Sequence, residues 1–158
     1  ISNDPDAIVC LRPGQKVRLF VYLSCYWSFY NCASVCNFAF IPRSITTSSE
    51  LVELVRGVTG WETSLWELMK AGERALTLSR AFNVREGVGP ADEWLPERFF
   101  TPHPTTPPYG VAVDPQAYRR AIGDYYAMMG WDTHGVPTDI KLHELGVPWV
   151  IGVLRGGR

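Results

Sequence analysis

Three of the four cysteines lie within twelve residues and are the side chains best suited to chemistry in this sequence. Cys25, Cys32 and Cys36 are spaced seven and four residues apart. On a helix these positions share one face, so their thiolates could bind an iron–sulfur cluster or zinc. Either site takes four ligands, and the sequence has no Cys-x-x-Cys pair. Small buried residues in a helix seam fit the spacing as well, and this is the interpretation we favour for Cys25 and Cys32.

The composition favours one domain over residues 1–158. Hydrophobic residues make up 46% of the chain, which is enough for a packed core. The net charge of −1 and the lack of a basic block argue against electrostatic binding of nucleic acid. No signal peptide is visible, and the clustered cysteines do not resemble a secreted disulfide framework. We therefore expect a cytoplasmic protein.

Residues 19–42 form an uncharged stretch between Arg18 and Arg43 that approaches the length of a membrane span. The stretch carries several polar side chains, among them Ser24 and Asn31. A core segment covered on all sides explains this composition better, so we predict no membrane contact. A membrane-anchored segment remains the alternative, and a monodisperse preparation without detergent would exclude it.

Local signals mark where helices begin and end. Thr47-Ser48-Ser49-Glu50 and Ser64-Leu65-Trp66-Glu67 are capping boxes, in which each of the two polar side chains can accept from the other residue's backbone N–H. We expect Gly57 to end the first of these helices. Asp114-Pro115 predicts the start of a later helix, and Gly130 predicts its end.

The remaining segments complete an all-α, irregular multi-helix domain of about five helices. A short helix is expected over residues 138–145, and no alternating pattern indicates a strand. Residues 1–18 are expected to form an N-terminal loop. Six of the twelve prolines fall within residues 87–113, which we expect to form a long Pro-rich arm.

Nine different short motifs follow one another between about residue 31 and residue 147. They are Asn31-Cys32-Ala33-Ser34-Val35-Cys36, Val58-Thr59-Gly60-Trp61, Gly72-Glu73-Arg74, Phe82-Asn83-Val84-Arg85-Glu86-Gly87, Asp92-Glu93-Trp94-Leu95-Pro96-Glu97-Arg98-Phe99, Tyr125-Tyr126, Gly130-Trp131-Asp132, Gly135-Val136-Pro137-Thr138 and Leu145-Gly146. Each is weak alone, but in this order and spacing they resemble the C-terminal part of the aldehyde ferredoxin oxidoreductase family. The family carries Asp-x-x-Gly-Leu-Cys where the first motif stands.

The resemblance implies roles for four residues of the first motif and its neighbour. The family's Cys is the last ligand of a [4Fe–4S] cluster, so Cys36 would be the metal ligand. The family's Asp contacts a pterin, and Asn31 would hydrogen-bond the pterin without that charge. Val35 and Asn37 would flank the pterin. Ser34 replaces the family's Gly, which puts a left-handed turn at this position in question. No catalytic residue is expected in this part of the family.

The resemblance also implies an activity for the complete enzyme. Members use tungsten (or molybdenum) held as a bis-pterin cofactor to oxidise an aldehyde to a carboxylic acid, and electrons leave through the [4Fe–4S] cluster. The expected partners are the N-terminal domains of the same enzyme, ferredoxin and the aldehyde substrate. We also expect the chain alone to expose an apolar face at residues 19–42 that the missing domains normally cover, and this face would support a homodimer. The chain by itself is expected to be an inactive fragment.

The main alternative is a helical interaction module that has lost its cofactor. Asn31 and Ser34 favour it, because each departs from the family pattern. Elsewhere we expect structural ion pairs and caps between helices rather than chemistry: Glu73 with Arg74, and Arg85 with Glu86.

Overall fold

A computed structural model describes residues 13–36, 38, 47–102 and 112–156, and the regular elements in these ranges are helices. No strand forms there, apart from an isolated bridge between Trp131 and Pro137. The elements are α2 (Pro13–Cys32), α3 (Ser48–Thr59), α4 (Leu65–Arg85), α5 (Pro115–Met129), α6 (Asp139–Glu144), α7 (Trp149–Gly156) and two short 3₁₀ helices, η2 (Pro90–Glu93) and η3 (Glu97–Phe99). The predicted all-α fold is confirmed, with six α-helices in the described ranges.

The predicted capping boxes start α3 and α4. At the first, the Glu50 N–H donates to Thr47 Oγ1 at 3.3 Å, and the Thr47 N–H donates to the Glu50 carboxylate at 2.5 Å. The predicted stop at Gly57 is wrong. The helix continues to Gly60, because that glycine adopts the left-handed conformation (φ 71°) and its N–H satisfies the Arg56 carbonyl.

Two predicted loops differ from the structure. Residues 13–18 are helical, so the N-terminal loop expected over residues 1–18 is wrong for that part. Pro13 suits the first turn of α2, because a helix does not use the N–H there. In the arm, η2 and η3 interrupt the extended backbone expected for residues 87–113. Residues 1–12 and 103–111 lie outside the described ranges.

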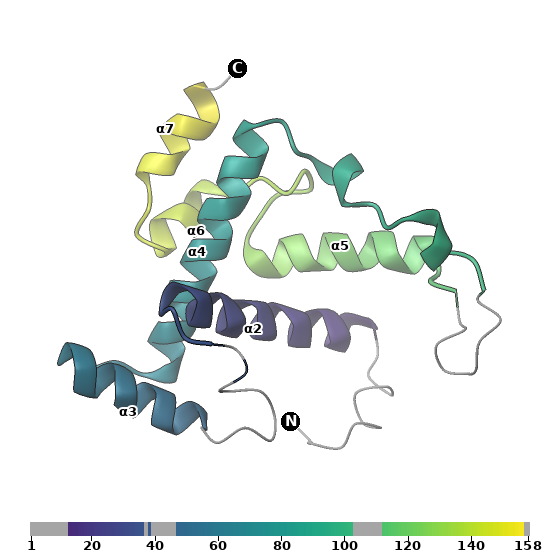
Figure 1. The fold of residues 1–158 in the computed structure, drawn as a ribbon. Coiled ribbons are helices and arrows are strands. Elements are labelled where there is room, and N and C mark those ends of the chain that lie inside the picture. Colours follow the sequence, from purple (N-terminus) through teal and green to yellow (C-terminus); the bar gives the residue numbers. More distant parts are fainter. Residues whose placement is uncertain (1–12, 37, 39–46, 103–111, 157–158) are drawn as a thin grey trace.

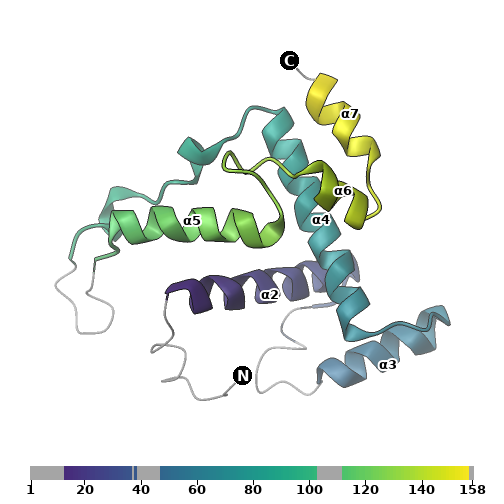
Figure 2. The same cartoon turned by 180° about the vertical axis from the view of Figure 1, so that it is seen from behind.

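The helix α4 is the centre of the fold. Figure 1 shows α2 and α5 side by side next to α4, with α3 near one end of α4 and α7 near the other. The reverse view in Figure 2 shows the same arrangement. An apolar cluster between α2 and α3 also includes the start of α4, and its buried members are Phe29, Tyr30, Leu51, Val52 and Leu68.

On one side of α2, every fourth residue is buried. Val17, Val21, Cys25 and Phe29 are all buried, which is the spacing of one helix face. The face meets α4 at Gly72, where the two backbones come into contact. Within the described ranges no helix has both the length and the apolar character needed to cross a membrane.

Candidate functional site

The C-terminal end of α2 is closed by a left-handed turn at Ser34. The Val35 N–H donates to the Tyr30 carbonyl at 3.0 Å, and the Ser34 N–H donates to the Asn31 carbonyl at 3.2 Å. This pair of bonds is the Schellman motif. Ser34 has a φ of 56° and is the one non-glycine residue with positive φ among those the structure describes. The turn for which Gly is best suited is therefore made by Ser, at a cost of about 1 kcal/mol.

Val35 anchors this turn to the rest of the protein. Its side chain packs against the apolar cluster between α2 and α3, which contains Tyr30. Tyr30 is fully buried, and its hydroxyl lies 2.5 Å from the hydroxyl of Tyr26. Burial raises the pKa of Tyr30, and the hydrogen bond with Tyr26 raises it further, so Tyr30 stays protonated. The packing of Val35 thus fixes the backbone directly before Cys36.

Cys36 is exposed immediately after this fixed turn. Asn31, one turn earlier on α2, is exposed as well. The structure therefore brings Asn31, Val35 and Cys36 together at one end of α2. Asn37 lies outside the described residues.

The other two cysteines of α2 differ from each other. Cys25 is buried, as predicted, whereas the predicted burial of Cys32 is wrong, since Cys32 is exposed in the last position of the helix. Burial, reinforced by the negative charge of Glu73, raises the pKa of the Cys25 thiol to about 11. A thiol that stays protonated is a poor metal ligand.

The described residues do not form a complete metal site. No group of three or more His, Cys, Asp or Glu side chains in those ranges could hold a metal ion. A [4Fe–4S] cluster takes four thiolates. The described residues therefore do not complete such a cluster by themselves, and further thiolates would have to come from elsewhere.

A second polar centre surrounds Arg80 on α4. Arg80 is 5% exposed, forms an ion pair with Glu93 and donates from Nε to the Gly135 carbonyl at 2.7 Å. Its guanidinium also lies over the ring of Tyr126, 5.1 Å from the centroid. The Tyr126 hydroxyl donates to Glu93, and burial together with that bond raises the pKa of Tyr126 to about 12.

This centre ties the arm to α4 and α5 and leaves no free charge for chemistry. Sequence reasoning missed Arg80, because its partners lie 13 to 55 residues away in the chain. The only signal was that Glu93, Tyr126 and Gly135 each fall within a family motif.

A third polar centre joins α4 and α6. Lys141 Nζ lies 2.7 Å from the Glu73 carboxylate, and Lys70 forms ion pairs with both Glu73 and Glu144. Glu73 and Arg74 do not pair with each other, but each joins α4 to the α6 segment, which agrees with the predicted ion pairs and caps between helices. Arg74 donates from Nε to the carbonyl of Leu145, the residue that caps the C-terminal end of α6.

The predicted Arg85–Glu86 ion pair is present at the end of α4. The two side chains meet at 2.7 Å, and both are about half exposed. An exposed pair of this kind contributes little to stability.

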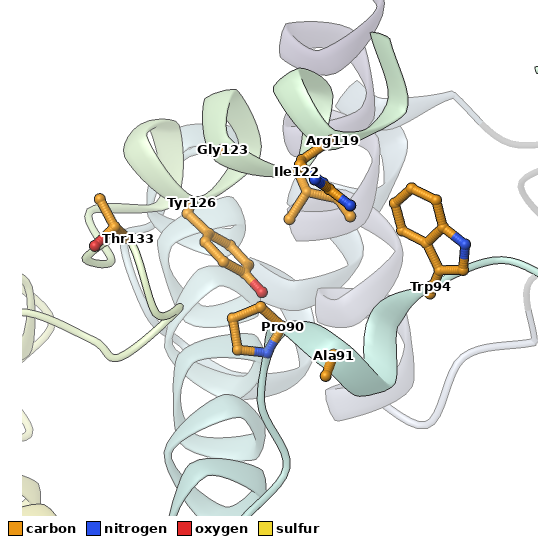
Figure 3. Close-up of a pocket in the computed structure, with 8 residues that line it drawn as sticks. All are labelled: Pro90, Ala91, Trp94, Arg119, Ile122, Gly123, Tyr126 and Thr133. Atoms are coloured by element: carbon orange, nitrogen blue, oxygen red, sulfur yellow. The ribbon is translucent and has the colours of Figure 1, made fainter. Parts of the chain in front are cut away.

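A pocket of about 600 Å³ lies between η2 and α5. Figure 3 shows Arg119, Ile122 and Tyr126 of α5 on one side, with Pro90 and Trp94 facing them. The pocket is separate from the end of α2, which lies by α3 (Figure 1).

The geometry defines an all-helical domain that presents one exposed cysteine after a left-handed helix end. The family model described as "Aldehyde ferredoxin oxidoreductase, domains 2 & 3" matches residues 3–147, and the chain belongs to that family.

Relatives support the assignment. The chain is 28% identical to the tungsten-containing aldehyde ferredoxin oxidoreductase of Pyrococcus furiosus over 135 residues, which cover 84% of this chain and 21% of that protein. It is also 28% identical to the aliphatic sulfonate oxidoreductase WOR-like subunit of the same organism. That match covers 76% of this chain and 20% of that protein. The chain thus spans about a fifth of the length of these relatives.

A solved structure shares the fold. The BamBC active site complex of benzoyl coenzyme A reductase, solved with 1,5-dienoyl-CoA, superposes with a TM-score of 0.74. The match covers 99% of this chain and 22% of that one, at 22% sequence identity. At this identity the match shows the fold alone.

Proposed function

We propose that the end of α2 forms one wall of a tungsten-pterin and iron–sulfur site in a complete aldehyde ferredoxin oxidoreductase. In this proposal Cys36 is a ligand of the [4Fe–4S] cluster, and Asn31, Val35 and Asn37 line the bis-pterin. The observation that carries it is the exposed Cys36, held directly after the Ser34 turn that Val35 anchors. The chain would act with the N-terminal domains of the same cytoplasmic enzyme.

The side chains fit these roles by their chemistry. Cys36 would hold the cluster as a thiolate, its proton being released on binding at Sγ. The Asn31 amide both donates and accepts, so it can pair with a ring nitrogen or an amine of a pterin. Cys25 stays outside the site, because it is buried where α2 packs against α4. The other helices serve to hold the end of α2 in place.

The chemistry that the bound cofactors would supply is the oxidation of an aldehyde to a carboxylic acid, with ferredoxin as electron acceptor. This chain contributes no catalytic residue to that step. Its part is to hold one iron ligand, to contact the pterin and to cover the site. The apolar face near residues 19–42, which the N-terminal domains would cover in the complete enzyme, would support a homodimer of this chain alone.

Iron analysis of the complete protein that contains these residues, purified without oxygen, tests the proposal. Cys36→Ser should lose about four iron atoms and the matching sulfide per chain relative to wild type. Cys32→Ser is the matched control, since Cys32 is also exposed, lies four residues away, and should keep the iron. Equal iron in wild type and Cys36→Ser would exclude Cys36 as a ligand.

The alternative of a cofactor-free helical interaction module rests on the uncharged Asn31 and on Ser34. It predicts that the complete protein holds neither tungsten nor molybdenum nor iron. The same metal analysis of wild-type protein separates the two functions, because only the first requires any metal.

A further inference from the structure

The pocket between η2 and α5 has the features of a small-molecule site. Its volume of about 600 Å³ lies in the range of ligand pockets. The lining is mostly apolar, with few polar groups, and consists of Pro90, Ala91, Trp94, Arg119, Ile122, Gly123, Tyr126 and Thr133 (Figure 3). Pockets of this composition bind the apolar body of a ligand and orient it through one or two polar contacts.

Arg119 supplies the charge in this lining. Its guanidinium lies over the Trp94 ring, 5.2 Å from the centroid, and Trp94 stacks on Phe100 at 4.9 Å. The stack holds an exposed arginine against the pocket wall (Figure 3). No carboxylate among the described residues pairs with Arg119, whereas neighbouring Arg120 lies 3.9 Å from Asp114. A stacked guanidinium keeps its in-plane N–H groups free to bind a carboxylate.

Glu93, which follows two residues after the lining residue Ala91, does not pair with Arg119. The carboxylate of Glu93 already pairs with Arg80 and accepts from the Tyr126 hydroxyl. Tyr126 therefore offers the pocket its ring rather than a free hydroxyl. The lining itself contains one cationic side chain and no carboxylate.

Gly123 keeps the pocket open on the α5 side. A Cβ built there meets no heavy atom within 4 Å, so neither packing nor backbone conformation requires glycine. Glycine is unfavourable inside a helix. Any larger side chain would extend into the space beside Ile122 and Arg119.

We propose that this pocket binds a small organic anion, namely a monocarboxylate with an apolar ring or chain. The carboxylate pairs with the Arg119 guanidinium, and the apolar body contacts Pro90, Ile122 and the Tyr126 ring. The site does not depend on the cofactor role of Cys36, because the two lie in different parts of the fold.

Isothermal titration of the complete protein with phenylacetate tests the proposal, with 2-phenylethanol as the neutral analogue of similar shape. Wild type should bind phenylacetate saturably and at least tenfold more tightly than the alcohol. Arg119→Gln should weaken phenylacetate binding about tenfold and leave the alcohol unchanged. Arg120→Gln is the matched control and should bind both compounds as wild type does.

Gly123→Leu provides a second variant, whose fold is checked by circular dichroism. It should abolish binding of both compounds by filling the pocket. The proposal is wrong if wild type shows no saturable phenylacetate binding, if the alcohol binds as tightly as the anion, or if Gly123→Leu binds normally. Equal weakening by Arg119→Gln and Arg120→Gln would also overturn it, since only Arg119 lines the pocket.

Discussion

A Cβ atom added at Gly72 would lie 1.9 Å from the Cys25 carbonyl oxygen, so α4 and α2 touch backbone to backbone at this crossing. The Phe29 amide nitrogen is also within 2.8 Å of that position. Neither backbone atom can move without shifting a helix. Gly72→Ala should therefore destabilise the protein by about 3 kcal/mol, the upper end for overpacking, as measured by urea denaturation.

Gly123→Ala is the control for the Gly72 prediction. Both glycines lie inside helices, but Gly123 has open space around its Cβ position. Its replacement should stabilise the protein by about 0.5–1 kcal/mol through helix propensity. If both variants changed stability in the same direction, close contact at Gly72 would not explain the effect.

Ser34→Gly should raise the free energy of unfolding by about 0.5–1 kcal/mol, because glycine adopts φ 56° without a clash at Cβ. The matched change is Gly60→Ser, which places a side chain at φ 71° with no neighbour within 4 Å. It should cost about 1 kcal/mol. Thermal unfolding of the two variants should shift in opposite directions, and a destabilised Ser34→Gly would contradict the strained turn.

Local signals predicted the parts of the fold that depend on a few adjacent residues. The capping boxes at Thr47 and Ser64 start α3 and α4, because their bonds close within three residues. Gly57 and Gly60 could each end α3, and the sequence did not reveal which would adopt the left-handed conformation. Pro13 was read as part of a loop, although proline is also favoured in a first helical turn.

Long-range contacts decided what local patterns could not. Glu73 and Arg74 were expected to form ion pairs and caps between helices, but the sequence does not reveal that the partner of Glu73 is Lys141 of α6, 68 residues later. Within the candidate site, the motif that contains Cys36 predicts the segment, and the structure adds that Cys36 is exposed. The burial of Cys25 and the exposure of Cys32 depended on where α4 crosses α2, which spacing along one helix does not determine.

Glu93→Gln should destabilise the protein by about 2 kcal/mol, because it leaves the buried Arg80 guanidinium without its ionised partner. Glu86→Gln is the control. Because its ion pair with Arg85 is exposed, this change should lower the free energy of unfolding by less than about 0.5 kcal/mol. Urea denaturation at neutral pH measures both. Similar losses in the two variants would show that the burial of Arg80 does not govern the effect.

The ion pairs between α4 and α6 should make stability depend on pH in the acid range. Hydrogen bonds from Lys141 and Lys70 lower the pKa of Glu144 below its ordinary value of 4.5. Burial alone lowers the pKa of Lys70, but its bonds to Glu144 and Glu73 outweigh burial and raise it, so Lys70 stays charged.

Because the pKa of Glu144 is lower in the folded state, its contribution to stability is present above pH 4.5 and is lost as the pH falls through the folded value. At pH 7 the free energy of unfolding of wild type should exceed that of Glu144→Gln by about 0.5 kcal/mol. The difference is small because the Glu144 side chain is 43% exposed. The difference should stay constant down to about pH 5 and shrink toward zero below pH 4.5. Urea denaturation across this range would contradict the assignment if the difference grew as the pH fell.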